Sequence, residues 1–233
     1  YIDTPTDVEY VQAFLQEYDL RRGLDAASPA RAALSVLPAL EARRGETWVV
    51  YAPPEELSAL LDGPALARAG VRVVLVRAQG GALPPELSGP GVALSAGDGG
   101  LLKHADTGIT VRPKVLDTLL SGGFLPVLTG SGEEAVAVAQ AMKAGRLVLF
   151  LSGEPSLTLG VDRQAELLHM DLAKAAELLR EGALPGPTAA ALKLACRGAE
   201  GGVKKAVLLN GSEPHALLRE ALGQRIMGLS VTP

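Results

Sequence analysis

Short apolar runs alternate with amphipathic stretches from residue 47 onward. Continuous apolar runs predict buried strands, and apolar residues three to four positions apart predict helices. Strands are expected at 47–51, 71–76, 92–94, 109–111, 124–128, 147–151 and 206–209, with an edge strand at 226–231. Helices are expected after Pro53-Pro54 and at 113–120, 133–143, 170–180, 187–197 and 214–222. Because helices separate the strands, the pattern predicts an α/β protein with a mostly parallel sheet.

The first 45 residues carry a different pattern, which predicts a separate helical segment. A capping box at Thr6 to Glu9 precedes an apolar stripe at helical spacing, formed by Val8, Val11, Leu15 and Tyr18. A second helix is expected after Ser28-Pro29, ending near Arg44-Gly45. The predicted organisation is therefore a helical segment at 1–45 and an α/β domain at 46–233. A short isolated helix is marginal in water, so the stripe is expected to pack against another subunit or its own domain.

Composition narrows the class of partners. The chain has 22 basic and 26 acidic residues, a net charge of −4, so it lacks the basic surplus typical of proteins that bind nucleic acid or anionic membranes. With 48% hydrophobic residues, it has enough apolar side chains for a substantial core. Cys196 is the single cysteine, which excludes an internal disulfide and argues against a zinc site. The first twenty residues are acidic, unlike a signal peptide. Together these features predict a cytoplasmic protein without membrane spans.

Three stretches of the second half carry a family resemblance. The first runs from Gly91 to Gly100 (GVALSAGDGG) and leads into residues 115–127 (VLDTLLSGGFLPV). The second is Ala141 to Ala144 (AMKA), and the third joins 201–205 (GGVKK) to 210–218 (NGSEPHALL). In this order, over residues 91–233, they resemble the amino-acid kinase family and in particular the acetylglutamate kinases.

The resemblance implies a fold, ligands and an assembly. The fold would be the family's three-layer α/β/α sandwich, in which 46–128 form the half that binds the acyl amino acid and 129–233 the half that binds nucleotide. An active member would use ATP and magnesium, with N-acetylglutamate as substrate, and arginine-sensitive members bind arginine. The N-terminal helices resemble the extra helix of arginine-sensitive kinases and the leading helix of acetylglutamate synthases. That likeness implies a homo-oligomer, built through the N-terminal helix as one possibility.

The positions that the resemblance assigns to phosphoryl transfer differ from the family pattern. The family's Lys-x-Gly-Gly strand end matches Tyr51-Ala52-Pro53-Pro54. This stretch has no cation, and its two prolines have no amide hydrogen to donate. The His-Gly-Gly-Gly loop is reduced to Gly80-Gly81, which is either an anion nest or a turn. The hairpin that grips substrate is replaced by residues 82–90 alone.

Two further catalytic features of the family have no match in the nucleotide half. The Asn-Ala-Asp motif matches Gly130 to Gly132, followed by Glu133 and Glu134, which are interpreted as ordinary acidic residues of a first helical turn. The second catalytic lysine matches Ala191. Phosphoryl transfer depends on cations and preorganised donors, so no catalytic residue is assigned.

Three functional hypotheses follow from this pattern. The favoured one is a catalytically degenerate, regulatory or assembly-forming protein linked to arginine biosynthesis, including the kinase-like module of an acetylglutamate synthase. The first alternative is an active acetylglutamate kinase whose remaining segments lie outside this sequence. The other is a structural partner of an active kinase.

The candidate site residues are few. Gly80, Gly81, Ser95 and Asp98 are candidates for binding substrate, because they lie in the two loops that resemble the family's substrate loops. His215 and Glu220 are candidates for an effector site, with a capping histidine and an exposed helix glutamate as the structural alternative. His104 and His169 are interpreted as solvated loop histidines, and no metal site or nucleophile motif is expected.

Overall fold

The computed structural model describes residues 40–78, 80, 82–106, 108–152, 168–182, 184–213, 215–223 and 228–233. The chain divides into two compact units, Tyr1–Arg43 and Arg44–Pro233. The predicted N-terminal helices fall almost entirely outside the described residues.

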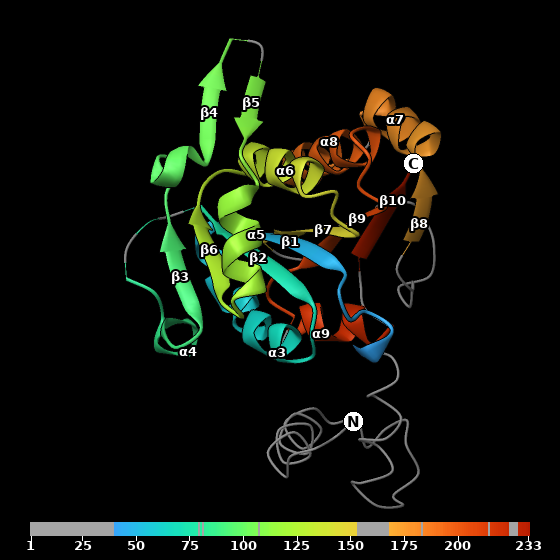
Figure 1. The fold of residues 1–233 in the computed structure, drawn as a ribbon. Coiled ribbons are helices and arrows are strands. Elements are labelled where there is room, and N and C mark those ends of the chain that lie inside the picture. Colours follow the sequence, from blue (N-terminus) through green and yellow to red (C-terminus); the bar gives the residue numbers. More distant parts are fainter. Residues whose placement is uncertain are drawn as a thin grey trace, which may run out of the picture. The chain divides into compact units, whose positions relative to one another are not determined.

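An eight-stranded sheet forms the middle of this unit (Figure 1), in the order β3-β6-β2-β1-β7-β9-β10-β8. Neighbouring strands are parallel except for the antiparallel pair of β9 and β10. The strands are β1 (Thr47–Ala52), β2 (Arg72–Arg77), β3 (Gly91–Leu94), β6 (Leu125–Thr129), β7 (Arg146–Leu151), β8 (Leu168–Asp171), β9 (Lys205–Asn210) and β10 (Gly228–Thr232). The predicted α/β class with a mostly parallel sheet is confirmed.

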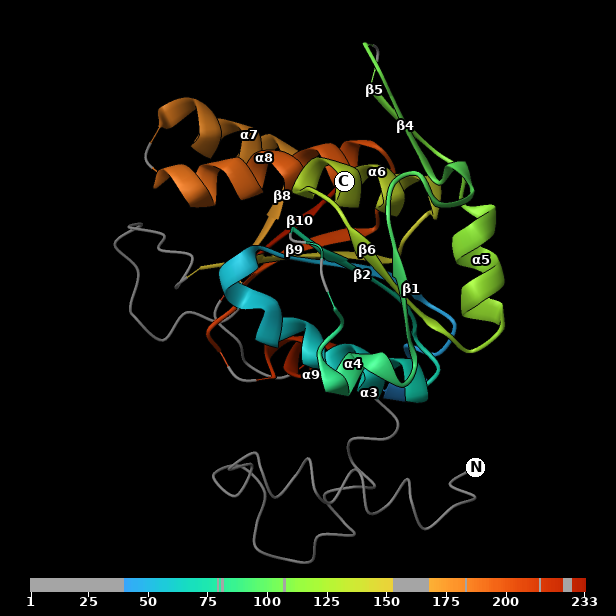
Figure 2. The same ribbon diagram turned by 90° about the vertical axis from the view of Figure 1, so that its left-hand side faces the viewer.

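Helices cover both faces of the sheet and complete a three-layer sandwich (Figure 2). One face packs against α5 (Lys114–Ser121), α6 (Gly132–Ala141), α7 (Leu172–Glu181) and α8 (Gly186–Glu200). The other packs against the 3-10 helix η2 (Pro54–Asp62), α3 (Gly63–Arg68), α4 (Pro85–Ser88) and α9 (Ala216–Ala221). The helix expected after Pro53-Pro54 therefore begins as a 3-10 helix, with a kink at Glu56.

Strand alternation explains how the two faces are filled. In β1, Val49 belongs to the core under α6 and α8, whereas Trp48 and Val50 point to the opposite face, and all three are fully buried. A strand that is buried on both faces reads as an unbroken apolar run, which is why β1 was predictable.

One end of the sheet differs from the sequence prediction. The strand expected at the edge, β10, lies inside the sheet between β9 and β8, so its prediction as an edge strand is wrong. The true edge strand is β8, which pairs in parallel with β10. A four-residue strand that carries His169 in place of an apolar run gives no clear periodic signal.

A separate antiparallel hairpin projects beyond α6 (Figures 1 and 2). It consists of β4 (Leu102–Ala105), which the sequence pattern does not predict, and β5 (Gly108–Val111), which it does. Ile109 and Val111 pack against the core, whereas Lys103 and Thr110 form an exposed pair. In the described part of the chain, no helix is long and apolar enough to cross a membrane.

Candidate functional site

The carboxyl ends of β1, β2, β6, β7 and β9 meet at one edge of the sheet, because these strands are parallel neighbours. Ligands of open α/β sheets bind at this edge. It is also where the family resemblance places the catalytic groups, so it is the candidate site. We call it the carboxyl edge.

Tyr51 lies at the carboxyl edge where the family pattern has a lysine. Its half-buried ring packs at the start of α6, where a Cβ atom added to Gly132 would lie 3.6 Å from the Tyr51 ring and 2.7 Å from Leu194 Cδ1. Burial raises the pKa of the Tyr51 phenol, and the negative charge of Glu55 raises it further. The group at this position is therefore a neutral phenol next to an aliphatic side chain.

Glu55 brings a carboxylate to the same edge. The Ser152 hydroxyl, directly after β7, donates a hydrogen bond to Glu55 Oε1. This hydrogen bond lowers the pKa of Glu55, because it stabilises the charged form. Glu55 and Ser152 are both exposed, so the charge is presented to solvent at the edge.

Glu56 fastens the start of η2 to the end of β9. Its buried carboxylate accepts a hydrogen bond from Ser212 Oγ at 3.2 Å, and the Ser212 amide donates to Asn210 Oδ1 at 3.0 Å. A Cβ atom at Gly211 would lie 2.6 Å from Glu56 Cγ. This close approach needs glycine at position 211, and it fills the space at the end of β9 with protein atoms.

The start of α6 is closed by its own capping box. Ser131 Oγ accepts from the Glu134 amide at 3.2 Å, and Glu134 Oε2 accepts from the Ser131 amide at 2.6 Å. Glu133 pairs with Arg197 on α8. The interpretation of Glu133 and Glu134 as residues of an ordinary acidic first turn is confirmed by this geometry.

Arg77 is the buried cation at the end of β2. Its Nη1 donates to the Ala82 carbonyl at 3.2 Å, which holds the loop that follows β2. Gly80 is exposed beside Thr129 of β6, where an added Cβ atom would lie 3.6 Å from Thr129 Cγ2. Gly81 lies outside the described residues, so the predicted Gly80-Gly81 nest stays a prediction.

Ser95 and Asp98 form a turn of their own after β3. Asp98 Oδ2 accepts from the Ser95 amide at 2.7 Å, and the Asp98 amide donates back to the Ser95 carbonyl at 3.1 Å. Both residues are exposed. The local hydrogen bonds are those of a closed turn, and a substrate-binding role for the pair stays a prediction.

His215 and Glu220 contact different partners, and their role in binding an effector stays a prediction. His215 Nδ1 lies 2.7 Å from Asp62 Oδ1 at the start of α9. Glu220, at the other end of this short helix, accepts from Lys205 Nζ at 2.9 Å and lies 3.0 Å from Arg146 Nη1. The alternative prediction of a capping histidine and an exposed helix glutamate is wrong. The Glu220 carboxylate is buried between two cations, and the His215 ring makes no capping hydrogen bond.

His104 and His169 are placed on strands, contrary to their interpretation as loop histidines. His104 Nε2, on β4, lies 3.2 Å from Glu134 Oε1, which ties the hairpin to the start of α6. His169 Nδ1, on β8, lies 2.5 Å from Ser230 Oγ of β10. The His169 contact joins paired residues of neighbouring strands, whereas the His104 contact joins the hairpin to a helix, and the sequence pattern revealed neither.

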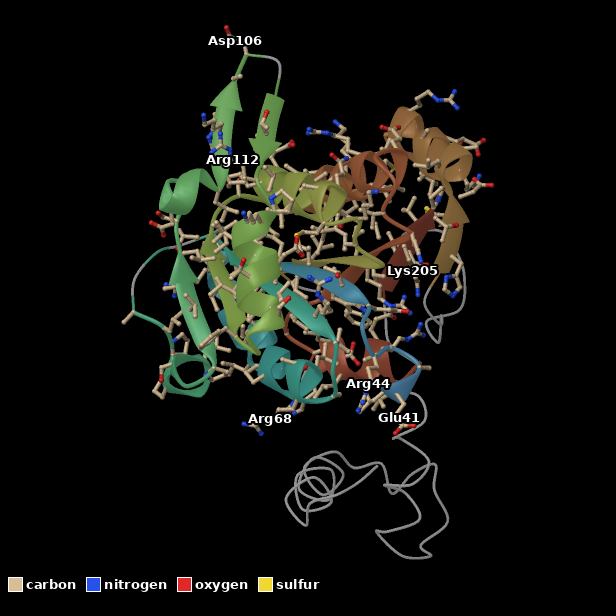
Figure 3. All side chains as sticks on the ribbon, viewed as in Figure 1. Glu41, Arg44, Arg68, Asp106, Arg112 and Lys205 are labelled. Atoms are coloured by element: carbon tan, nitrogen blue, oxygen red, sulfur yellow. The ribbon has the colours of Figure 1, made fainter. Side chains whose placement is uncertain are left out.

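The described residues contain no cluster of three or more side chains suited to a metal ion. An open hollow of about 670 Å³ lies along the outer side of α5, lined by Val111, Arg112, Pro113, Lys114, Asp117, Thr118 and Ser121. Figure 3 shows Arg112 at the base of the projecting hairpin and Asp106 at its tip. None of the predicted site residues lines this hollow.

The serine–carboxylate contacts are the feature of the site that sequence reasoning missed. Glu55 and Ser152 are 97 positions apart, and Glu56 and Ser212 are 156 apart. The available signal was two acidic residues directly after the first strand. Their partners are set by the order of strands in the sheet.

Comparison with known proteins supports a distant relationship. No family model matches the chain. It is 28% identical over 170 residues to the acetylglutamate kinase of Caldanaerobacter subterraneus, covering 63% of this chain and 57% of that kinase. It is 28% identical over 168 residues to the acetylglutamate kinase of a Synechococcus species, covering 62% and 54%. The matches thus span somewhat more than half of these relatives' length.

Solved structures share the fold. The N-acetylglutamate synthase of Neisseria gonorrhoeae, determined with coenzyme A and L-arginine, superposes with a TM-score of 0.67 at 18% identity, over 88% of this chain and 65% of that one. Carbamate kinase of Giardia lamblia superposes with a TM-score of 0.54 at 11% identity, over 81% and 98%. Identities this low show the fold alone. The chain thus has the amino-acid kinase fold, and the sequence matches show a distant relationship to the acetylglutamate kinases.

Proposed function

We propose that this chain is a catalytically degenerate, acetylglutamate-kinase-like module that works by binding an effector or by assembly, without transferring phosphate. The observation that carries the proposal is the chemistry of the carboxyl edge. A neutral Tyr51 stands at the position that the resemblance matches to the family's lysine, and the charge of Glu55, hydrogen-bonded to Ser152, acts on it. The Glu56 carboxylate accepts from Ser212 at the end of β9.

A nucleotide brings several negative charges, which need cations and free amide donors. Here Glu55 presents another negative charge, and the third amide of α6 is already bonded to Ser131. Removal of one preorganised donor from an active site lowers the rate by a factor of about 10²–10³, and this edge departs from the family pattern at several positions.

The proposed setting is arginine biosynthesis in the cytoplasm, with N-acetylglutamate or arginine as the small-molecule ligand and a homo-oligomer as the assembly. The N-acetylglutamate synthase that shares the fold was determined with L-arginine, and in a second structure with N-acetylglutamate. This likeness favours the hypothesis that the chain is the kinase-like module of an acetylglutamate synthase.

The test is calorimetry with ATP and magnesium, N-acetylglutamate and L-arginine, together with a coupled assay for ADP release. We expect no turnover and no binding of ATP with a micromolar Kd. A micromolar Kd would correspond to a binding free energy of about −8 kcal/mol. A turnover near the enzyme median of about 10 s⁻¹ would overturn the proposal and favour the active kinase. The Glu55→Gln, Glu56→Gln double variant serves as the matched comparison, because it removes the negative charges and keeps the side-chain shape.

A further inference from the structure

The hollow beside α5 has the size of a small-molecule binding site. Its volume of about 670 Å³ lies within the range of about 300–1,000 Å³ that is usual for such sites. The end of β5 and one side of α5 form its lining. No residue described above at the carboxyl edge belongs to this lining. The hollow is therefore a separate candidate for ligand binding.

Two cations stand in the lining of the hollow. Arg112 directly follows β5 and Lys114 begins α5, and both residues are exposed. The lining also contains the carboxylate of Asp117, which lies 2.6 Å from Arg72 Nη2. This ion pair offsets the negative charge of Asp117, so the hollow keeps a net positive charge.

The root of the hairpin positions Arg112. The Arg112 amide donates to the Leu101 carbonyl at 2.9 Å, and Pro113, the next residue, restricts the backbone. A Cβ atom added to Gly100 would lie 3.7 Å from Arg112 Nη1, so the guanidinium group lies over this glycine. Figure 3 shows the side chain at the base of the hairpin. A cation on such a packed support loses less conformational freedom when it binds a ligand.

The remainder of the lining follows one side of α5. Lys114, Asp117, Thr118 and Ser121 are spaced three to four positions apart, so they form a stripe along the helix. Leu116, on the opposite side, is fully buried and anchors the helix in the core. Thr118 Oγ1 donates to the Lys114 carbonyl at 2.8 Å, and its oxygen can still accept a hydrogen bond. The stripe thus places a cation and hydroxyl groups along a rigid support.

We propose that this hollow binds a small dicarboxylate, the class of ligand to which N-acetylglutamate belongs. Arg112 presents a planar fork of donors to one carboxylate, and Lys114 presents a point charge to the other. Val111 and Pro113 supply apolar surface for the carbon chain between them. The inference rests on the proposed effector-binding function, and it names the chemistry of the effector and the place where it binds.

The charges of the domain favour the hollow over the carboxyl edge for such a ligand. At the carboxyl edge, Glu55 presents a negative charge to solvent, and the carboxylate of Glu56 already accepts from Ser212. Like charges repel, so Glu55 disfavours a dicarboxylate there, whereas Arg112 and Lys114 attract it to the hollow.

NMR chemical-shift mapping on the full chain tests the place of binding. The ligands are N-acetyl-L-glutamate and glutarate, which is a plain dicarboxylate, and putrescine, a diamine, is the control ligand. We expect both dicarboxylates to shift the amides of residues 111–121 with saturation, and rising salt to weaken the binding. Putrescine should leave these amides unchanged, because the cations of the hollow repel it.

Paired variants test the residues. In the Arg112→Gln, Lys114→Gln double variant, the Kd for N-acetylglutamate should rise at least about tenfold, because hydrogen bonds to charged groups are lost. The Lys193→Gln, Lys204→Gln double variant is the matched control, since it removes the same charge from exposed positions outside the hollow and should keep the original Kd. Asp117→Asn should lower the Kd about threefold, because it removes a negative charge from the lining. A damaged fold would not tighten binding in this way.

Three results would overturn the assignment. The first is an equal loss of affinity in the two double variants, which would mean that only the net charge of the chain matters. The second is the absence of shifts in residues 111–121 at millimolar ligand. The third is a calorimetric signal for N-acetylglutamate that maps to another part of the domain, which would refute this hollow and leave the proposed effector function standing. Conversely, ADP release in the coupled assay would refute the proposed function even with the hollow mapped as expected.

Discussion

Lys205 donates a hydrogen bond across 2.9 Å to Glu220, whose side chain is 5% exposed. Arg146 lies 3.0 Å from the same carboxylate, and its guanidinium group stacks 5.0 Å from the centre of the Trp48 ring. The amino ends of β1, β7 and β9 are thus tied to α9 through one glutamate. Figure 3 shows Lys205 on this part of the sheet.

Replacement of Glu220 by glutamine is expected to destabilise the domain by about 3 kcal/mol, because breaking a buried ion pair leaves its cations without compensation. The measurement is the free energy of unfolding from denaturant titration. The Asp117→Asn variant is the control, since its pair with Arg72 is much more exposed and such pairs contribute only about 0–1 kcal/mol. Equal losses in the two variants would show that burial of Glu220 does not matter.

Alanine at position 211 is expected to destabilise the domain by about 1–3 kcal/mol, because its Cβ atom would overlap the Glu56 side chain. Gly97→Ala is the matched control, as an added Cβ atom meets nothing within 4 Å there and its φ is −76°. Thermal unfolding of both variants measures the difference. A neutral Gly211→Ala would mean that η2 and the end of β9 are not packed as described.

The hydrogen bond from Ser152 sets the titration of Glu55. It lowers the pKa of Glu55 in the folded protein, so its contribution to stability is present above the unfolded pKa and is lost as pH falls through the folded pKa. In Ser152→Ala, the carboxyl should titrate at higher pH, as seen by carbon-detected NMR. Glu177, whose pKa is lowered by Lys174, should not change, and an unchanged Glu55 would contradict the contact.

The apolar stripe of the N-terminal segment remains the predicted assembly element. We expect the intact chain to sediment as a larger species than the Val11→Asp, Leu15→Asp double variant, because buried apolar contacts drive subunit association. A chain truncated before Arg31 should match the double variant. If all three sediment alike, the stripe does not form the assembly contact.

The sequence predicts those elements of the fold that have a clear local pattern of apolar residues. β1, β2, β7 and β9 are apolar runs, and their observed bounds agree with the prediction to within a residue or two. β4 and β8 were missed because each carries a histidine in a short polar strand and acquires its structure from a partner strand. The place of β10 inside the sheet was missed because strand order is a property of the whole fold.

The candidate site divides in the same way. The match of Tyr51 to the family's lysine is a prediction that the sequence alone permits, since it needs only the position at the end of a strand. The burial of Glu220 between Lys205 and Arg146 is not, because those cations begin strands that neighbour each other only after folding. A strand end at the carboxyl edge can thus be read from a short-range pattern, whereas the ion pairs of Glu220, at the amino ends of β7 and β9, depend on long-range contacts.

The antiparallel insertion of β10 has a consequence for synthesis on the ribosome. In the described sheet, β8 pairs with β10 alone, and β10 is made after all the helices from α7 to α9. Until β10 emerges, the nascent chain carries the β8 segment without its partner and the free edge of β9 without a cover. Unpaired strand edges recruit other chains, so during this interval the growing polypeptide is open to misassembly and to binding by chaperones.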